Sequence, residues 1–299
     1  MFPSYACSCG FCPFSSPILH FAVFTLSFLM LPLINLHNHS SYSDGTLTPE
    51  ALVREVARAG IKYFSLTDHD ITGGWAGLEP ALKEAGIIYC YGVELSSNLH
   101  DSLHILGYGL DPANPALLVK TAGFREKRRE RLKQIMALLR GLGLDVSYEE
   151  LPFNNACTIG RPHIANLLKK KCLVKAHKEA FERYIGWGRP AYVPPNGPCI
   201  EEVIKTIKAA GGLAVLAHPG VVAKILDLAA WKEMGLDGIE AFYPSHSNTR
   251  TREFIALAAR YGLFITAGID FHGPGTDRDK MFGFEYSDEM FKGIKKAFI

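Results

Sequence analysis

The sequence predicts an α/β protein with mainly parallel strands and a core of barrel size. A pattern of a helical segment, a glycine and a short apolar strand recurs along the chain, for example around Gly60 and around Gly262. Each copy leads to a histidine or an acidic residue, and α/β barrels carry such groups at the carboxyl ends of their strands. With 299 residues, 48% of them hydrophobic, the chain is long enough to bury a core of that size.

Capping signals locate the helices of this alternation. Thr48 followed by Pro49 and Glu50 gives an N-cap, a proline at the first helical position and an acid in the first turn, so we expect a helix over residues 51–59. Amphipathic patterns predict two further helices, at 201–210 and at about 249–260. Glycine after a helix supplies the left-handed C-cap that turns the chain into the next strand.

The strand after each of these glycines leads to candidate functional groups. They are, in chain order, Asp68 and His69, Glu94, His218, Glu240, and Asp270 with His272. His104 is an exception because it lies near the start of its strand, residues 103–108, which we therefore expect to run against the others. The repeat stops between residues 111 and 198, where proline-rich turns enclose helical segments. We interpret 111–198 as a helical insertion that caps the open end of a barrel formed by 33–110 and 199–299.

Two ligand pairs at opposite ends of the chain predict a metal site. His37-x-His39 follows the apolar run at 33–36, and Asp270-x-His272 follows the run at 263–269. Residues two apart on a strand point to the same side, so each pair can present two ligands to one point. Imidazoles and carboxylates gathered from several strand ends are typical of a multinuclear hydrolytic centre.

Residues 1–32 form an apolar segment without a single Lys, Arg, Asp or Glu. It lacks the basic start and the small-residue cleavage site of a secretory signal, and its strongly apolar part is shorter than the roughly 20 residues that span a bilayer. We interpret it as a weakly ordered leader, with a membrane or export role as the alternative. The cysteine count is odd, at seven, and Cys90, Cys157, Cys172 and Cys199 have no metal-ligand spacing, which favours a reduced, cytoplasmic protein. The other three, in 7–12, are close together as zinc ligands can be, but no fourth ligand with finger-like spacing follows.

The charge balance excludes a protein that coats polyanions as a whole. Its 32 basic and 30 acidic residues give a formal charge of only +2, so any preference for an anionic partner must be local. The basic segment 124–133 could guide a nucleotide or short RNA, or could simply be a solvated helix face. We expect no sequence-specific DNA binding and no membrane partner.

An ordered set of motifs resembles the PHP (polymerase and histidinol phosphatase) family. The motifs are His37-x-His39-Ser40, Tyr42-x-Asp44-Gly45, Thr67-Asp68-His69-Asp70, Gly92-x-Glu94, His218-Pro219-Gly220 and Asp270-x-His272. Gly160-Arg161-Pro162-His163 and the segments 191–194 and 243–247 are similar to the branch that contains RNase AM and the 3′,5′-nucleoside bisphosphate phosphatases. The resemblance implies a distorted (β/α)₇ barrel. It also implies a phosphatase of such nucleotides, or a nuclease that shortens small RNAs from the 5′ end.

Carried over by motif, the resemblance implies two to three divalent metal ions. The first ion would take His37, His39, Glu94 and Asp270; the second Glu94, His104 and His218; the third Asp44, His69 and His272. Ligation by nitrogen and oxygen without cysteine favours Mn²⁺, Fe²⁺ or Zn²⁺, and we expect Mn²⁺. Glu94 would bridge two ions that activate a hydroxide and clamp the phosphoryl oxygens.

Residues outside the metal set are candidates for substrate binding and proton transfer. Arg161 is the first choice for holding a phosphate because its planar guanidinium can grip two oxygens, and Arg189 is the second. Glu240 could bind substrate and His246 could donate a proton to the leaving oxygen, although structural roles are the alternative for both. We expect Asp68 and Asp70 to orient His69.

Two other functions are compatible with the same residues. One is a phosphatase of histidinol phosphate on the same scaffold. The other is a module that binds metal and nucleic acid without turnover, although such a module has no need of all nine ligands.

Overall fold

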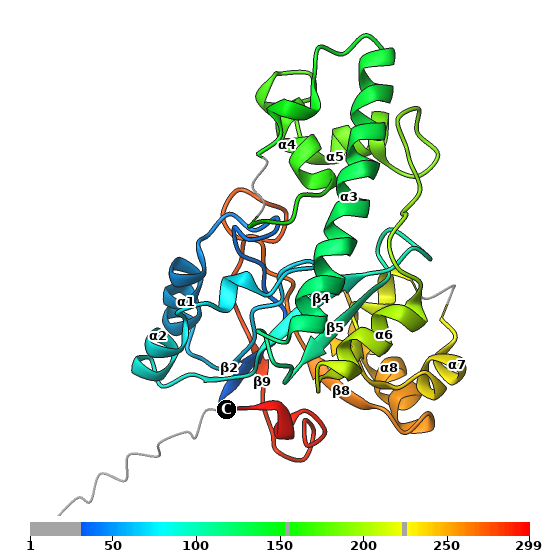
Figure 1. The fold of residues 1–299 in the computed structure, drawn as a ribbon. Coiled ribbons are helices and arrows are strands. Elements are labelled where there is room, and N and C mark those ends of the chain that lie inside the picture. The colour runs from blue at the N-terminus through cyan, green and yellow to red at the C-terminus, as the bar shows by residue number, and fades with distance from the viewer. Residues whose placement is uncertain (1–30, 153–155, 223–225) are drawn as a thin grey trace, which may run out of the picture. The chain divides into compact units, whose positions relative to one another are not determined.

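The computed structural model describes residues 31–152, 156–222 and 226–299 (Figure 1). The predicted leader, with its three cysteines, lies outside the described residues as far as residue 30. Within the described ranges, no helix combines the length and the apolar character needed to cross a bilayer.

Nine strands form two sheets. The four-stranded sheet has the order β3-β2-β1-β9 and contains β1 (Leu33–Asn35), β2 (Ile61–Phe64), β3 (Ile88–Tyr89) and β9 (Phe284–Glu285). The five-stranded sheet has the order β4-β5-β6-β7-β8 and contains β4 (Gly92–Ser96), β5 (His104–Tyr108), β6 (Leu213–Leu216), β7 (Leu236–Phe242) and β8 (Phe264–Ala267).

Strand directions agree with the predicted alternation. β1, β2 and β3 are parallel, as are β6, β7 and β8. β5 is antiparallel to both β4 and β6, which confirms the prediction that the strand with His104 runs against the others. His104 is the first residue of β5, so this reversal brings it to the same edge as the carboxyl ends of the parallel strands.

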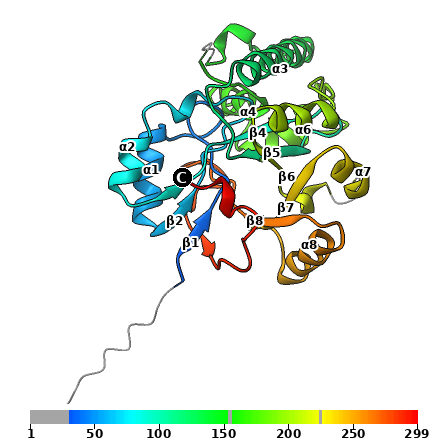
Figure 2. The same cartoon turned by 60° about the horizontal axis from the view of Figure 1, so that its bottom comes forward.

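The predicted closed barrel is not seen as one continuous sheet. Between the described strands of the two sheets, the structure has isolated bridges, from Asn38 to Phe271 and from His69 to Glu94, and single backbone hydrogen bonds such as that from the Leu36 amide to the Ala267 carbonyl oxygen, but no continuous ladder. The strands of the smaller sheet are two to four residues long. The mixed α/β architecture is confirmed, with the strands arranged around a ring and helices outside it (Figure 2).

Helices cover the outside of the strands. They are α1 (Pro49–Arg58), α2 (Glu79–Glu84), α6 (Ile200–Ala209), α7 (Leu228–Glu233) and α8 (Asn248–Arg260). The Thr48 side chain accepts a hydrogen bond from the Ala51 amide as the N-cap of α1, as predicted. Short 3₁₀ turns occur at Gly73–Trp75, Tyr148–Glu150, Pro219–Val221 and Lys295–Ala297.

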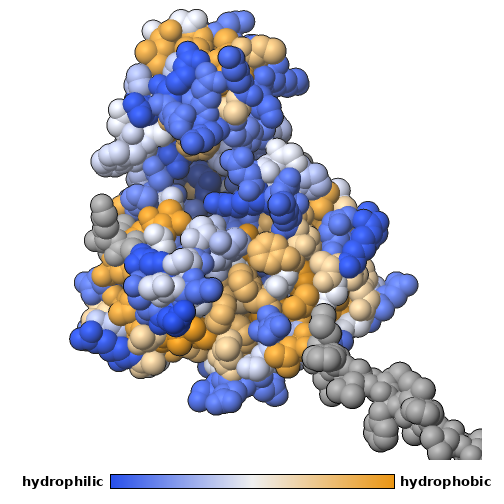
Figure 3. Space-filling view, turned by 180° about the vertical axis from the view of Figure 1, so that it is seen from behind, coloured by the Kyte–Doolittle hydropathy of each residue, from blue (hydrophilic) through white to orange (hydrophobic). Residues whose placement is uncertain are grey.

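The described residues between 111 and 198 include α3 (Pro115–Gly141), α4 (Arg161–Lys170), α5 (His177–Ala180) and a π-helical turn at Phe181–Ile185. Their mostly hydrophilic surface borders a hollow in the space-filling view (Figure 3). A division of the chain at 111 and 198 remains a prediction, because α3 places Leu117 in the core of the strands and Leu132 in a separate core shared with α4.

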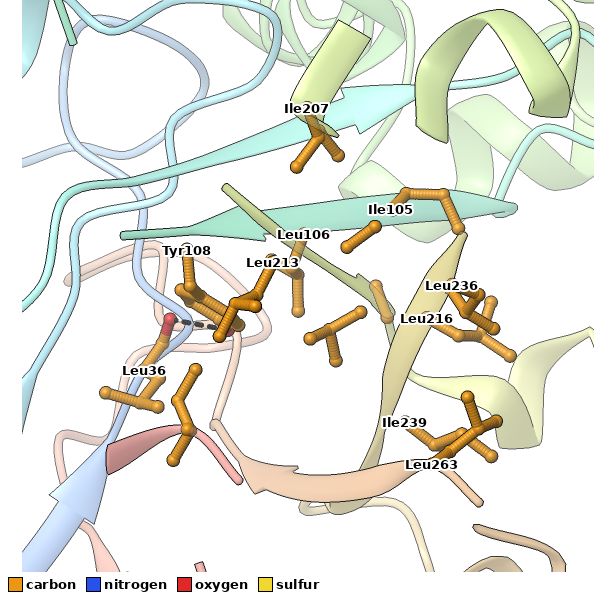
Figure 4. Packing of buried hydrophobic residues seen from close by; sticks show 14 of the residues in the cluster. Leu36, Ile105, Leu106, Tyr108, Ile207, Leu213, Leu216, Leu236, Ile239 and Leu263 are labelled. Carbon is orange, nitrogen blue, oxygen red and sulfur yellow. Dashed lines mark hydrogen bonds between the residues drawn. The ribbon is translucent and has the colours of Figure 1, made fainter. Parts of the chain in front are cut away.

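The main core lies between the five-stranded sheet and its helices (Figure 4). Leu106, Leu216 and Ile239 are fully buried there, and each such side chain contributes about 1.5–3 kcal/mol when it leaves water. The Tyr108 hydroxyl donates a hydrogen bond of 3.0 Å to the carbonyl oxygen of Leu36. This contact ties β5 to the end of β1, where the predicted site begins.

Candidate metal centre

The structure brings all nine predicted ligands to one end of the strands. His37 and His39 follow β1, His69 follows β2, His218 follows β6, and Asp270 and His272 follow β8. Glu94 lies in the middle of β4 and Asp44 lies in the turn after His39. The order of strands in the sheets, rather than proximity in sequence, therefore assembles the cluster.

Glu94 is the centre of the cluster. Its Oε1 atom lies 2.8 Å from His104 Nδ1 and 3.1 Å from His218 Nε2. Its Oε2 atom faces three other imidazoles, at 3.1 Å from His37 Nε2, 3.1 Å from His39 Nε2 and 3.2 Å from His69 Nδ1. The two oxygens thus face different sets of histidines, as a bridging carboxylate would.

Three groups of side chains are compact enough to hold an ion each. In every group one ligand atom per residue lies within 4.8 Å of the others: His37, His39, Glu94 and Asp270; His39, Asp44, His69 and His272; and His69, Glu94 and His104. The first group is the set expected for the first ion. The others overlap the expected second and third sets, with His39, His69 and Glu94 each shared between two groups. His218, expected in the second set, is in none of the three groups, although its Nε2 atom contacts Glu94.

Buried polar atoms that make no hydrogen bond indicate whether these residues could bind metal ions. Five buried atoms of these residues make no hydrogen bond of good geometry: His39 Nε2, Asp44 Oδ1, His69 Nδ1, His218 Nδ1 and Asp270 Oδ1. Three of them, in His39, His69 and Asp270, nevertheless lie 3.1–3.2 Å from a side-chain atom of another ligand. A buried polar atom without a partner costs about 1–3 kcal/mol, and proteins rarely collect several in one place without a ligand. Nitrogen and carboxylate oxygen donors suit divalent cations of borderline hardness. The donor set therefore fits such ions.

Burial and the charged groups of the cluster shift the pKa values of these side chains. Burial lowers the pKa of His39, but the carboxylates of Asp270 and Glu94 outweigh that effect and raise it to about 9. Burial also raises the pKa of Glu94, but His69, His37 and His104 hold it well below its ordinary value. Binding of a divalent cation would displace the proton that these carboxylates favour on His39.

A cavity of about 320 Å³ opens onto the cluster. Its floor includes Glu94, His104 and His218 from the strand ends. Its opposite wall comes from the helical segment and includes Arg128 and Arg131 of α3 and Arg161 at the start of α4. The ligand cluster is therefore accessible to a small molecule that also contacts these arginines.

Comparison with known proteins agrees with this arrangement. The model of the PHP domain family matches residues 35–185, about half of the chain. This protein belongs to the PHP domain family. The PHP domain protein is 37% identical over 253 residues to a 3′,5′-nucleoside bisphosphate phosphatase of Chromobacterium violaceum, covering 81% of this chain and 88% of the relative.

Other relatives carry related descriptions. A 5′-3′ exoribonuclease of Haemophilus influenzae is 32% identical over 249 residues, covering 80% of this chain and 90% of the relative. The crystal structure of a putative metal-dependent phosphoesterase from Bifidobacterium adolescentis superposes with a TM-score of 0.78 at 28% identity, covering 88% of this chain and 94% of that one.

Glu240 lies behind the cluster of this PHP protein and does not line the cavity. It is fully buried; its Oε1 atom lies 3.0 Å from His37 Nδ1, and its Oε2 atom accepts a hydrogen bond of 2.8 Å from the His218 amide. A proton on His37 Nδ1 would leave Nε2 free to face Glu94 and Asp270. This placement favours a role in orienting His37 over the predicted contact with substrate.

Replacing Glu240 by glutamine should weaken metal binding by about 10- to 100-fold, as the loss of a partner behind a metal-binding histidine does. Glutamine has one acceptor oxygen where Glu240 uses two, so either His37 Nδ1 or the His218 amide faces an NH₂ group. Isothermal titration with Mn²⁺ measures the effect, and Glu253→Gln, on the exposed face of α8, is the matched control. Equal affinity in the two variants would contradict the orienting role.

His246 is also placed differently from the prediction. Its Nδ1 atom lies 2.9 Å from the carbonyl oxygen of Ala241, and its Nε2 atom accepts a hydrogen bond of 3.1 Å from the Gly220 amide. Both ring nitrogens are thus occupied by backbone, burial lowers the pKa of the ring, and His246 is not among the residues that line the cavity. These contacts favour the structural alternative over proton donation.

The two predicted arginines have different surroundings. Arg161 lines the cavity, where its Nη1 atom lies 2.9 Å from Asp101 Oδ2. Arg131 contacts the other oxygen of Asp101 at 2.5 Å, so one carboxylate holds two guanidinium groups in the wall. Arg189 is exposed and lies outside the lining, because the turn after Gly186 directs it away from the cavity.

Asp68 and Asp70 support other residues than His69. Asp68 accepts hydrogen bonds from the hydroxyls of Ser40 and Ser43, and Ser43 Oγ lies 3.3 Å from His39 Nδ1. Asp68 therefore acts on His39 through a serine. Asp70 instead anchors the insertion, because its Oδ2 atom lies 2.8 Å from Arg128 Nε of α3.

Arg278 was not singled out by the sequence, although it lines the cavity. Its Nη1 atom lies 2.5 Å from Asp270 Oδ2, and Tyr243 donates a hydrogen bond of 3.0 Å to the same oxygen. Asp270 Oδ1 is left to face His37 and His39, at 3.4 and 3.1 Å. Arg278 lies in a loop without a regular pattern, so only its position eight residues after Asp270 could have drawn attention to it.

Backbone strain accompanies the cluster. Four described residues other than glycine have a positive φ angle, and Asp70, His218 and Asp270 are three of them. Such conformations cost about 1–3 kcal/mol each and persist where the surroundings hold a functional side chain in place. Gly268 is required for a different reason, since a Cβ atom there would lie 2.3 Å from His37 Cβ.

Proposed function

We propose that the protein is a metal-dependent phosphoesterase that hydrolyses 3′,5′-nucleoside bisphosphates, short RNA from the 5′ end, or both. The observation that carries the proposal is the position of Glu94, whose two oxygens face separate sets of histidines on the floor of a cavity with an arginine-rich wall. The relatives described as a bisphosphate phosphatase and an exoribonuclease support this substrate class.

Different residues would bind the metal ions, orient the metal ligands and contact the substrate. Two to three divalent ions, with Mn²⁺ as our expectation, would activate water and neutralise the phosphoryl oxygens. His37, His39, Asp44, His69, Glu94, His104, His218, Asp270 and His272 would hold them. Glu240 keeps His37 Nε2 directed at the cluster, and Tyr243 with Arg278 keeps Asp270 Oδ1 directed at it. The guanidinium of Arg278, half exposed beside the cluster, can also contact a phosphoryl oxygen.

The cavity has cationic groups in two places. Arg278 lies beside the metal cluster, and Arg131 with Arg161 lies in the helical wall. A substrate with one phosphate at the metal cluster and a second phosphate elsewhere on the sugar can contact the arginines in both places. Histidinol phosphate carries one phosphate and a cationic amine, so the second place favours a bisphosphate or an RNA end over that substrate.

A panel of four substrates tests the proposal: adenosine 3′,5′-bisphosphate, adenosine 3′-monophosphate, a 5′-phosphorylated RNA trinucleotide and histidinol phosphate. With Mn²⁺ present, we expect phosphate release from the bisphosphate, mononucleotide release from the RNA, or both. Turnover of histidinol phosphate alone would contradict the proposal. Metal binding without turnover of any of the four would favour the non-catalytic alternative.

Arg161→Gln should lower kcat/KM for substrates with a second phosphate much more than for substrates without one. A hydrogen bond to a charged group contributes about 1.5–3 kcal/mol, so kcat/KM for the bisphosphate should fall by about 10- to 100-fold. The value for adenosine 3′-monophosphate should change little. Arg140→Gln, on the exposed side of α3, is the control. Equal losses on both nucleotides would contradict a role of Arg161 in holding the second phosphate.

A further inference from the structure

Trp187 is the most exposed large hydrophobic residue of the described ranges. It is 78% exposed, whereas the other two tryptophans of the chain, Trp75 and Trp231, are 4% and 3% exposed. An indole ring gains about as much from burial as any side chain, so leaving it in water is costly. Trp187 belongs to none of the buried hydrophobic clusters of the described residues.

The loop holds the indole in a defined place. Trp187 lies between Gly186 and Gly188, and the positive φ of Gly188, 69°, turns the chain sharply. The Arg189 amide donates a hydrogen bond of 3.0 Å to the carbonyl oxygen of Gly186, which closes the turn. The ring of Tyr192 lies 5.3 Å from the indole, with 66° between the two planes. An edge-to-face pair of this kind leaves aromatic surface free for a third ring.

The same loop is connected to the arginine-rich wall of the cavity. The side chain of Arg131, which contacts Asp101 together with Arg161, donates hydrogen bonds to the carbonyl oxygen of Val193, at 2.9 and 2.6 Å. Val193 follows Tyr192 directly in the chain. Burial and then the carboxylate of Asp101 raise the pKa of Tyr192, which agrees with this placement. The contacts of Arg131 therefore connect the cavity wall to the loop that carries Tyr192 and Trp187.

We propose that Trp187, supported by Tyr192, is a stacking platform for a nucleobase of single-stranded RNA. The reacting nucleotide would lie in the cavity, and the base of a following nucleotide would stack on the indole outside it. Aromatic side chains beside arginines are the usual means of binding single strands without reading their sequence. The inference rests on the proposed function and deepens it, because it makes an oligonucleotide a better ligand than a mononucleotide.

Binding measured without turnover tests the platform. The full-length protein is titrated in excess chelator with a 5′-phosphorylated adenylate trimer and, separately, with adenosine 3′,5′-bisphosphate. Because two of the three tryptophans are buried, quenching of the exposed indole fluorescence reports on Trp187. We expect the trimer to bind more tightly and to quench more strongly than the mononucleotide.

Variants distinguish stacking from a general loss of structure. Stacking of one base is lost in Trp187→Ala, which should weaken trimer binding by about 5- to 150-fold and leave mononucleotide binding within about twofold. Trp187→Phe should retain most of the affinity, measured by calorimetry. Val119→Ala removes another exposed apolar side chain, 74% exposed on α3, and should bind both ligands as the unaltered protein does.

The outcomes separate this inference from the proposed function. Equal affinity of the unaltered protein for trimer and mononucleotide, or an unchanged trimer affinity in Trp187→Ala, would overturn the platform. Hydrolysis of the bisphosphate in the Mn²⁺ assay would still support the proposed function in that case. If the trimer binds through Trp187 but neither the trimer nor the bisphosphate is hydrolysed in the Mn²⁺ assay, the platform is retained and the proposed function is contradicted.

Discussion

Replacement of Glu94 by glutamine should lower the rate of phosphate release by about 10³-fold. Bridged metal ions contribute several kcal/mol to the stabilisation of a phosphoryl transition state, and about 4 kcal/mol corresponds to a factor of 10³. Glutamine keeps the size of Glu94 but removes its charge, and one of its two terminal groups becomes a donor. Either the pair His104 and His218 or the group around His37 then faces an NH₂ group.

The measurement combines activity with metal content and folding. Initial rates with Mn²⁺ are compared with the bound metal determined by mass spectrometry, and circular dichroism verifies the fold. Glu84→Gln, at the exposed end of α2, is the matched control because it makes the same chemical change away from the cluster. Full activity of Glu94→Gln with a normal metal content would exclude Glu94 as the bridge between ions.

Removal of metal should abolish turnover and lower the thermal stability of the protein. Buried atoms of His39, His69 and Asp270 make no hydrogen bond of good geometry within the protein, and bound ions would satisfy them. A ligand at a concentration 100 times its dissociation constant stabilises the native state by about 2.7 kcal/mol. For a chain of this size, we expect Tm to rise by about 4 °C when Mn²⁺ saturates one such site.

Calorimetry and activity assays before and after chelation test this expectation. Re-addition of Mn²⁺, Fe²⁺ or Zn²⁺ to the chelated protein should restore activity to different extents, which identifies the productive ion. Mg²⁺ is a useful comparison because it prefers oxygen ligands and suits a histidine-rich cluster poorly. Turnover that persists in excess chelator, or a Tm that does not respond to any of these ions, would contradict a metal-dependent mechanism.

Local signals in the sequence predicted much of the fold. The N-cap at Thr48 and the glycines after helices act over a few residues, so α1, α6 and α8 were expected within one or two residues of their observed bounds. The position of His104 near the start of its apolar segment, rather than after it, predicted the direction of β5. Closure of the strands into one sheet depends on ladders between distant segments, and the expected continuous barrel was not found.

The sequence by itself determined the ligand pairs, because residues two apart at the end of a strand share a side whatever the rest of the fold does. Only the tertiary structure decided which residues orient these ligands through hydrogen bonds and ion pairs. The partner of His37 is 203 residues away in Glu240, and the partner of Asp270 is Arg278 in an irregular loop. Such contacts depend on strand order and loop path, which local patterns do not encode. For the same reason the buried contacts of His246 and the exposure of Trp187 became visible only in three dimensions.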